Sequence, residues 1–286
     1  MTYLLSFAWV TLVAILLALA HVALGTLTAT FALAFLYMPA PLVGALIAER
    51  IAGRALLGSF EGFHVQKRRL ILTVIAVAIA IYLGDFALTV IFGNLAGLPG
   101  VGGLAVDQAA LQLRLAEMLP DGAATPHLPP PVVLYAGAFV AALIAGFTVN
   151  GFFAFGEEYA WRGLFMDELR ALGPLRANII VGIAWGLWHA PLILMGFNYG
   201  QHALLGVPAM CVFTTAFAFV LWYARERTGS LLAPAILHGA FNGFAGIFVI
   251  MLSRRDSLIA APVGLIGAAA IALVAVALAP RVRRPA

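Results

Sequence analysis

Long runs of apolar residues separated by short polar stretches dominate this chain, and their lengths predict helices that cross a membrane. A helix needs about 20 apolar residues to span ~30 Å of hydrocarbon. The first run, 1–48, is long enough for two spans joined by a turn near Gly25. Six further runs follow, at 70–92, 132–153, 178–195, 204–223, 231–252 and 258–278. The pattern predicts an all-α, polytopic transmembrane helical bundle of about eight spans.

The basic residues lie in alternate loops between these runs, and this arrangement orients the bundle. Lys and Arg are enriched in the cytoplasmic loops of membrane proteins. Of the 16 basic residues, 13 fall in one set of alternating loops: Arg50, Arg54, Lys67, Arg68, Arg69, Arg162, Arg170, Arg176, Arg225, Arg227, Arg281, Arg283 and Arg284. The opposite set holds Arg114, Arg254 and Arg255. We therefore expect a multi-pass protein of the inner (plasma) membrane with both termini in the cytoplasm, although Arg254 and Arg255 lie on the less favoured side.

Two connections are longer than turns. Residues 50–69 mix basic and apolar side chains, which is typical of an amphipathic segment at the cytoplasmic interface. Residues 94–131 form a long external stretch rich in Gly and Pro, and within it 106–119 has the pattern of a short helix. The chain thus divides into N-terminal membrane helices with these two loops, 1–131, and a second group of membrane helices, 132–280.

The composition agrees with a membrane protein. Hydrophobic residues make up 64% of the chain and charged residues 10%, whereas soluble domains carry roughly 25% charged residues. This excludes an ordinary soluble enzyme, a disordered chain and a disulfide-rich secreted scaffold. Cys211 is the single cysteine, so neither an intramolecular disulfide nor a Cys-based zinc cluster can form. The net charge of +4 comes from residues that flank apolar runs, so we expect contact with the lipid bilayer and no nucleic-acid partner.

A few ionisable or amide side chains fall inside or at the ends of the apolar runs, where such groups are costly and usually functional. They are Asp85, the segment 157–162, His189, and the pair His238 and Asn242. For Asp85 a structural role is the better interpretation. Glu158 and Arg162 are four residues apart, so on a helix they face each other as an ion pair. Glu157 then points about 100° away and is available for another role.

This set of side chains suits the attack of water on a carbonyl group. A carboxylate near a histidine can act as a general base on water. A histidine and an asparagine on one helix face, as His238 and Asn242 are, can donate hydrogen bonds to a developing oxyanion. No serine or cysteine stands out as a nucleophile, so hydrolysis by water is favoured. Glu157, His189 and His238 would equally suit a zinc ion with an open fourth position, although no HExxH motif is present.

Three short motifs in this order resemble the CPBP intramembrane protease family, which includes type II CAAX prenyl endopeptidases and bacteriocin self-immunity proteins. EExxxR is matched by Glu157-Glu158-Tyr159-Ala160-Trp161-Arg162. FxxxH is matched by Trp185-Gly186-Leu187-Trp188-His189, with Trp in place of Phe, and HxxxN by His238-Gly239-Ala240-Phe241-Asn242. The resemblance covers roughly 154–246, and residues before about 150 contain no motif of the family.

The resemblance implies an eight-helix membrane endopeptidase whose active site opens toward the cytoplasm, with 132–280 as its catalytic core. It implies that Glu157 and His189 activate water, that His238 and Asn242 stabilise the oxyanion, and that Glu158 and Arg162 hold the site together. Glutamic and zinc-dependent mechanisms both remain open. We expect a membrane-associated peptide or protein as substrate, without a requirement for prenylation.

Two other function classes remain as alternatives. One is a non-catalytic immunity or assembly factor built on the same scaffold. The other is a transporter, which is disfavoured because the polar groups cluster in the C-terminal half of the chain. The oligomeric state, the substrate's identity and the role of the external loop 94–131 do not follow from the sequence.

Overall fold

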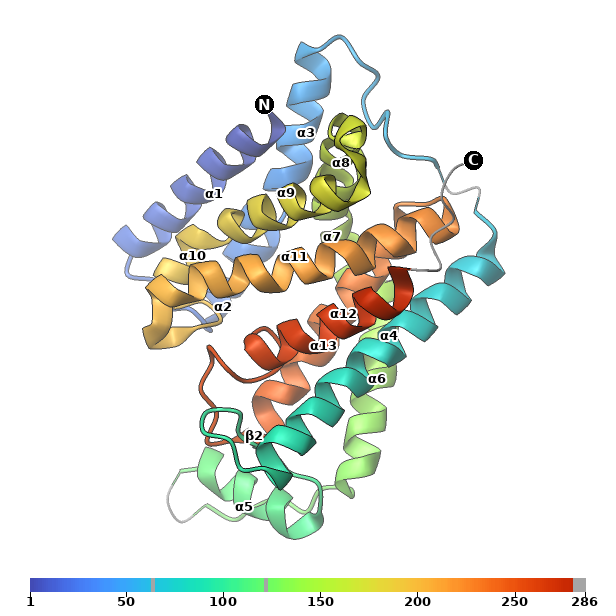
Figure 1. Cartoon of the computed structure of the whole chain (residues 1–286). Helices are drawn as coiled ribbons and strands as arrows, with labels where there is room; N and C mark the ends of the chain where they lie inside the picture. Colours follow the sequence, from blue (N-terminus) through green and yellow to red (C-terminus); the bar gives the residue numbers. More distant parts are fainter. Residues whose placement is uncertain (63–64, 121–122, 280–286) are drawn as a thin grey trace.

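The N-terminal third of the chain forms three long helical segments. The computed structural model describes residues 1–62, 65–120 and 123–279 (Figure 1). Helix α1 (Thr2–Leu19) turns back into α2 (Leu27–Ala32), η1 (Leu33–Tyr37) and α3 (Ala40–Ile51). The turn includes Gly25 at φ +90°, a left-handed conformation that glycine adopts without strain. The first apolar run therefore holds two helical segments that turn near Gly25, as predicted.

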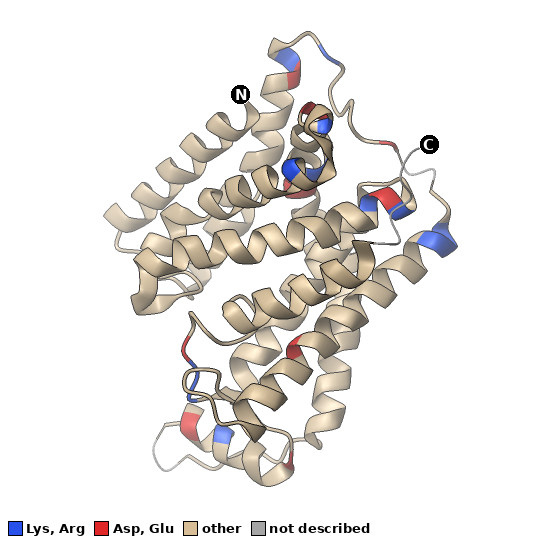
Figure 2. Cartoon of the chain, in the orientation of Figure 1, with Lys and Arg blue, Asp and Glu red and all other residues tan. Residues whose placement is uncertain are grey.

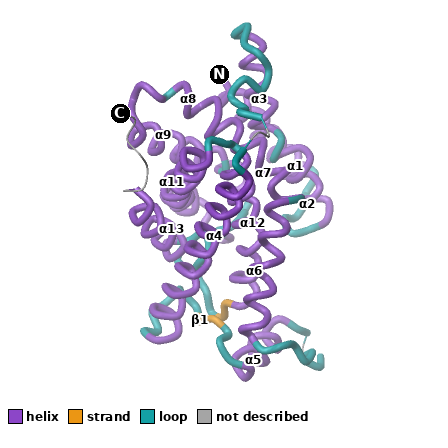
Figure 3. Tube along the Cα trace, turned by 90° about the vertical axis from the view of Figure 1, so that its right-hand side faces the viewer, coloured by secondary structure: helices purple, strands orange, loops and turns teal. Residues whose placement is uncertain are grey.

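The next segments connect the two halves of the chain. Helix α4 (Lys67–Thr89) continues into η2 (Val90–Leu95) and is followed by the short strand β1 (Gly103–Leu104) and helix α5 (Gln108–Met118). Helix α5 confirms the short helix predicted at 106–119, and α6 (Pro131–Phe147) begins at a proline. Proline suits the first position of a helix because its missing N–H has no partner there. Figure 3 shows that α5 and β1 lie at one end of the molecule and α3 with the loop after it at the other.

The predicted span at 132–153 is interrupted. The chain bends by 57° between α6 and α7 (Val149–Glu158). Thr148, at φ −128° and ψ −110°, lies outside helical geometry and separates the two helices. The direction of the chain thus changes ten residues before the two glutamates. Helix α7 then continues into the π-helical η3 (Tyr159–Phe165), α8 (Met166–Glu168) and the short η4 (Arg170–Leu172).

The remaining elements complete the bundle. Helix α9 (Gly173–Trp188) is followed by α10 (Ala190–Leu194), η5 (Gly200–His202) and α11 (Ala203–Thr228). Helix α12 (Leu232–Met251) leads into strand β2 (Leu252–Ser253), and α13 (Leu265–Leu278) is the last described helix. Strand β2 pairs antiparallel with β1, with Gly103 opposite Ser253. This pairing fixes the end of α12 to the connection between α4 and α5.

The helices are long and apolar enough for a polytopic membrane protein. Among the described residues, six helical segments meet the length and hydropathy expected of a membrane span, and the bent pair α6–α7 makes up to seven. Helix α13 is apolar but shorter, with 14 residues. Charged side chains gather at two ends of the bundle and are sparse between them (Figure 2). The predicted all-α polytopic bundle is confirmed. The number of spans and the cytoplasmic termini stay predictions, and Arg281, Arg283 and Arg284 lie outside the described residues.

Close helix contacts bring the C-terminal motifs together. Helix α12 packs against α6 and α7, and α9 packs against α11. A Cβ atom on Gly239 would lie 2.5 Å from the backbone nitrogen of Gly151, and one on Gly186 would lie 2.5 Å from Cα of Cys211. Only glycine allows backbones to approach so closely. These contacts hold the helices of the second and third motifs against their neighbours.

The basic loop after α3 packs on the same helices. Between Ile51 and Lys67 the described residues form turns, where an amphipathic segment along the interface was expected. Glu49 explains the difference, because its carboxylate accepts hydrogen bonds from the backbone N–H groups of Leu57 and Gly58 and from the hydroxyl of Tyr159. Farther along, Glu61 pairs with Arg225 at 3.0 Å.

Arg225 ties this loop to the π-helical segment η3. It also pairs with Asp167 at 3.0 Å and donates to the backbone carbonyl of Arg162. Tyr159 and Arg162 both belong to η3, so the loop and α11 fix this segment from two sides. π-Helical turns are rare and frequently occur at functional sites.

Candidate active site

The first motif places two buried glutamates at the end of α7. Glu158 is fully buried and its Oε1 accepts a hydrogen bond from Nη1 of Arg162 at 3.0 Å. This is the ion pair that the spacing predicted. Glu157 is 3% exposed, and its Oε2 accepts a hydrogen bond from the indole Nε1 of Trp185 at 2.7 Å. The two adjacent carboxylates therefore have separate partners.

His238 of the third motif joins the ion pair. Its Nδ1 lies 2.8 Å from Oε1 of Glu158, and the side chain is almost entirely buried. A carboxylate oxygen accepts, so Nδ1 carries the hydrogen in this contact and the second ring nitrogen, Nε2, has no partner among the described residues. One carboxylate oxygen thus connects Arg162 in η3 with His238 in α12.

His189 of the second motif lies between α9 and α10. Its Nδ1 is 2.9 Å from the backbone carbonyl of Trp185. A carbonyl oxygen can only accept a hydrogen bond, so this contact places the hydrogen on Nδ1. In a neutral imidazole the lone pair then resides on Nε2, which is the state that a general base requires.

Trp185 contacts side chains from all three motifs, and no separate role was predicted for it from the sequence. Besides its bond to Glu157, its ring lies 4.2 Å from the Arg162 guanidinium carbon in a cation–π contact. Its ring also packs edge-on against His238, at 5.2 Å between centroids, and its carbonyl orients His189. The departure from the family's phenylalanine was the available signal, because tryptophan adds an N–H donor that phenylalanine lacks.

Four of the six predicted site residues line one cavity of about 340 Å³: Glu157, His189, His238 and Asn242. Glu158 and Arg162 lie behind its wall. Most of the remaining lining is aromatic or aliphatic, as in pockets that bind apolar ligands with a few polar contacts. Asn242 is exposed and makes no side-chain hydrogen bond to the described residues. His238 therefore faces this cavity with Asn242, one helical turn along α12.

Asp85 is separate from this group. It is fully buried in α4, and neither carboxyl oxygen has a hydrogen-bond partner among the described residues. It does not line the cavity.

As they lie in the structure, Glu157, His189 and His238 do not form the three-ligand zinc site that remained possible from the sequence. No group of three His, Cys, Asp or Glu side chains in the described ranges is close enough to hold a metal ion. One oxygen of Glu157 is occupied by Trp185, and Nδ1 of His238 by Glu158. Zinc at Glu157, His189 and His238 would need these side chains to rearrange, and it stays an untested prediction.

Comparisons with known proteins agree with the motifs. Residues 131–244 match the family described as type II CAAX prenyl endopeptidase Rce1-like. This part of the chain is therefore similar to the CPBP family that the three motifs resemble. A curated relative, CAAX prenyl protease 2 of Methanococcus maripaludis, is 32% identical over 98 residues, which are 30% of this chain and 34% of that protein. The matched part thus spans about a third of the length of the relative.

The CPBP match contains all three motifs and the bend at Thr148. It begins one residue before the predicted second group of helices, 132–280, and ends inside α12. The division of the chain into 1–131 and 132–280 is otherwise untested and stays a prediction. The family match extends over the helices that supply Glu157, His189, His238 and Asn242.

Proposed function

We propose that this protein is an intramembrane endopeptidase that hydrolyses peptide bonds of a membrane-associated peptide or protein. The observation that carries this proposal is the cavity within the helical bundle onto which Glu157, His189, His238 and Asn242 converge. The CPBP-family match and the relative named as a CAAX prenyl protease support the same reaction class.

In this mechanism Glu157 and His189 activate a water molecule. Trp185 occupies Oε2 of Glu157, which leaves Oε1 to accept a proton, and His189 offers the lone pair of Nε2. The water oxygen forms a bond to the peptide carbonyl carbon while its proton passes to one of these two bases. The same proton then reaches the leaving nitrogen as the C–N bond breaks.

His238 and Asn242 face the oxygen that becomes negatively charged. Asn242 has a free amide donor, and His238 donates from Nε2 when its ring is doubly protonated. Glu158 orients the ring for this role, since its carboxylate accepts the Nδ1–H.

The zinc-dependent mechanism remains the alternative reaction chemistry. In it the same residues, Glu157, His189 and His238, would hold the metal. Metal analysis of the purified protein, together with activity before and after chelation, separates the two mechanisms. We propose the metal-free glutamate and histidine mechanism because the present hydrogen bonds already orient both bases.

We propose that the protein lies in the inner (plasma) membrane with both termini in the cytoplasm. The resemblance implies access to the site from the cytoplasm. The cavity lining also includes Phe197, Asn198 and Val263, which belong to connections that this orientation places outside. Access from the cytoplasm and the proposed orientation are therefore separate predictions, and each requires its own test.

The proposed activity is tested with purified protein in phospholipid vesicles and a library of quenched fluorescent apolar peptides. We expect cleavage by the wild type and none by Glu157→Gln. Glutamine keeps a carbonyl oxygen that can accept the Trp185 N–H, so this variant should retain its fold. Cleavage by Glu157→Gln at the wild-type rate would overturn the assigned mechanism, whereas a wild-type protein that cleaves no peptide would favour the non-catalytic alternative.

A further inference from the structure

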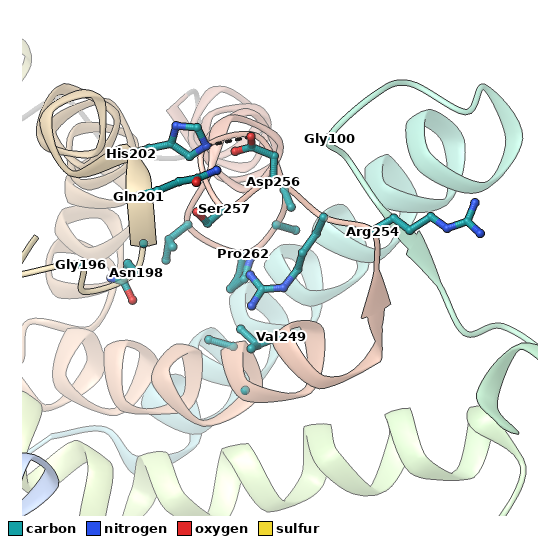
Figure 4. A pocket seen from close by; sticks show the side chains of 17 residues that line it. Gly100, Gly196, Asn198, Gln201, His202, Val249, Arg254, Asp256, Ser257 and Pro262 are labelled. Carbon is teal, nitrogen blue, oxygen red and sulfur yellow. Dashed lines mark hydrogen bonds and ion pairs between the residues drawn. The ribbon is translucent and has the colours of Figure 1, made fainter. Parts of the chain in front are cut away.

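A second pocket, of about 720 Å³, adjoins the catalytic cavity. Its walls come from the segment between α10 and α11, the C-terminal part of α12, the segment between β2 and α13, and Gly100 (Figure 4). Asn198, Ala245 and Val263 line both this pocket and the catalytic cavity. The two spaces therefore meet, and one extended molecule can occupy both.

Hydrogen bonds between distant segments build the walls of this pocket. Nε2 of His202 lies 2.9 Å from Oδ2 of Asp256, as drawn in Figure 4. The backbone N–H of Asp256 donates to the carbonyl of Gly100 at 2.8 Å, and its Oδ1 accepts from the backbone N–H of Leu258. Both oxygens of the only carboxylate in the lining are thus engaged within the protein.

Arg255 is a basic side chain of the pocket with unmet hydrogen-bonding capacity. It makes no ion pair or side-chain hydrogen bond within the described ranges. Partial burial, followed by the nearby guanidinium of Arg114, lowers the pKa of Arg255. A partly desolvated guanidinium next to a like charge is stabilised by an anion, and Arg forms its best hydrogen bonds with carboxylates and phosphates.

Neighbouring polar groups suit an anion of single charge. Asn198 and Gln201 contribute side-chain amides to the lining. Arg254, Arg255 and Asp256 are the charged side chains among the described residues of the lining. In Figure 4 the side chain of Arg254 extends away from His202 and Asp256, and both oxygens of Asp256 are already engaged. Arg255 is therefore the cation placed to contact a ligand, and its single charge matches a carboxylate better than a doubly charged phosphate.

We propose that this pocket binds a carboxylate of the peptide substrate through Arg255 while a nearby peptide bond lies in the catalytic cavity. The inference rests on the proposed endopeptidase function and adds to it a class of substrate: apolar peptides with an acidic group at a fixed distance from the cleaved bond. The fixed distance follows because the two spaces meet at Asn198, Ala245 and Val263.

A binding measurement tests the proposed contact between Arg255 and a substrate carboxylate independently of catalysis. Fluorescein-labelled apolar decapeptides, each with one Asp at a different position or the matching Asn, are titrated into Glu157→Gln protein in phosphatidylcholine nanodiscs. We expect one Asp position to bind roughly tenfold more tightly than its Asn counterpart, as for a charge-assisted hydrogen bond. Adding Arg255→Gln should abolish this preference and Arg255→Lys should restore part of it. Arg176→Gln, at an exposed arginine that lines neither space, should leave it unchanged.

Three results would overturn the proposal. The first is equal binding of Asp and Asn peptides at every position, and the second is a preference that survives Arg255→Gln. The third is that Arg255→Gln lowers the affinity for phosphatidylglycerol vesicles while the preference for Asp peptides stays intact. That result would mean that the pocket binds a lipid headgroup. Failure of the endopeptidase proposal gives a different pattern, namely no cleavage by the wild type whatever the charge of the peptide.

Discussion

The indole N–H of Trp185 donates to Oε2 of Glu157 at 2.7 Å, so the first residue of the second motif fixes the proposed base in the first motif. Trp185 lies in α9 and Glu157 in α7, and the two residues are 28 positions apart in the chain. The bond leaves Oε1 of Glu157 available to water. Trp185 thereby acts as a positioning residue, since it touches the base and not the reacting atoms.

Replacing Trp185 with phenylalanine, the family's residue, tests this relationship. Phenylalanine keeps an aromatic ring beside Arg162 but removes the N–H donor. We expect kcat to fall about tenfold with little change in KM, because the loss of a hydrogen bond to a charged group costs about 1.5–3 kcal/mol. Steady-state kinetics on a cleaved peptide measure both constants.

Trp161→Phe is the matched control for that variant. Trp161 is also buried, but its Nε1 has no hydrogen-bond partner among the described residues. The control should lose some stability through reduced packing and keep kcat near the wild-type value. Equal losses of kcat in the two variants would show that ring volume, rather than the bond to Glu157, explains the effect.

Arg162→Met should strongly destabilise the protein. It leaves the buried Glu158 carboxylate without its guanidinium partner, and breaking a buried ion pair from one side costs about 3–5 kcal/mol. Adding Glu158→Gln removes the unpaired charge, so the double variant should be more stable than Arg162→Met alone. Thermal unfolding in detergent compares the variants, and a double variant less stable than Arg162→Met would contradict the buried-charge explanation.

Gly239→Ala should disturb the contact between α12 and α7. Its Cβ would lie 2.5 Å from the backbone nitrogen of Gly151, so the helices must separate, at a cost of about 1–3 kcal/mol. His238 and Asn242 would move with α12, and activity should fall along with stability. Gly246→Ala is the control on the same helix, because nothing lies within 4 Å of its added Cβ. Similar melting temperatures for the two variants would argue against close packing at Gly239.

Cysteine labelling tests the proposed orientation of the protein in the membrane. In a Cys211→Ala background, which contains no other cysteine, single cysteines replace Arg176 or Arg254. We expect a membrane-impermeant maleimide to label position 254 in intact cells and position 176 only after lysis. The reverse pattern would invert the orientation and place the connections at 195–202 and 254–264 in the cytoplasm.

The helical architecture was accessible from the sequence because its signal is local. Apolar runs long enough to cross a bilayer correspond to the helices, and the spacing of Glu158 and Arg162 predicted their ion pair. The motifs also named side chains that the structure places around one cavity. Each of these features depends on residues close together in the chain or on short, ordered motifs.

Features that depend on distant contacts were not predicted. The 57° bend at Thr148 falls within a run predicted as one span, and α12 packs on both halves of the bent segment. From the sequence, Trp185 was interpreted as a conservative aromatic replacement. Its bond to Glu157 was not predictable, because it requires α7 and α9 to lie side by side. The pocket around Arg255 likewise depends on the pairing of β1 with β2 and on the contact between Asp256 and Gly100.

The most direct test of the central claim compares new protein N-termini in cells that produce the wild type, Glu157→Gln or Asp85→Asn. Asp85 is the matched acidic residue, since it is equally buried but lies outside the cavity. We expect a set of cleaved membrane-associated substrates with the wild type and with Asp85→Asn, and no such set with Glu157→Gln. The same cleavages in cells that produce Glu157→Gln at normal abundance would overturn the role of Glu157 as the catalytic base.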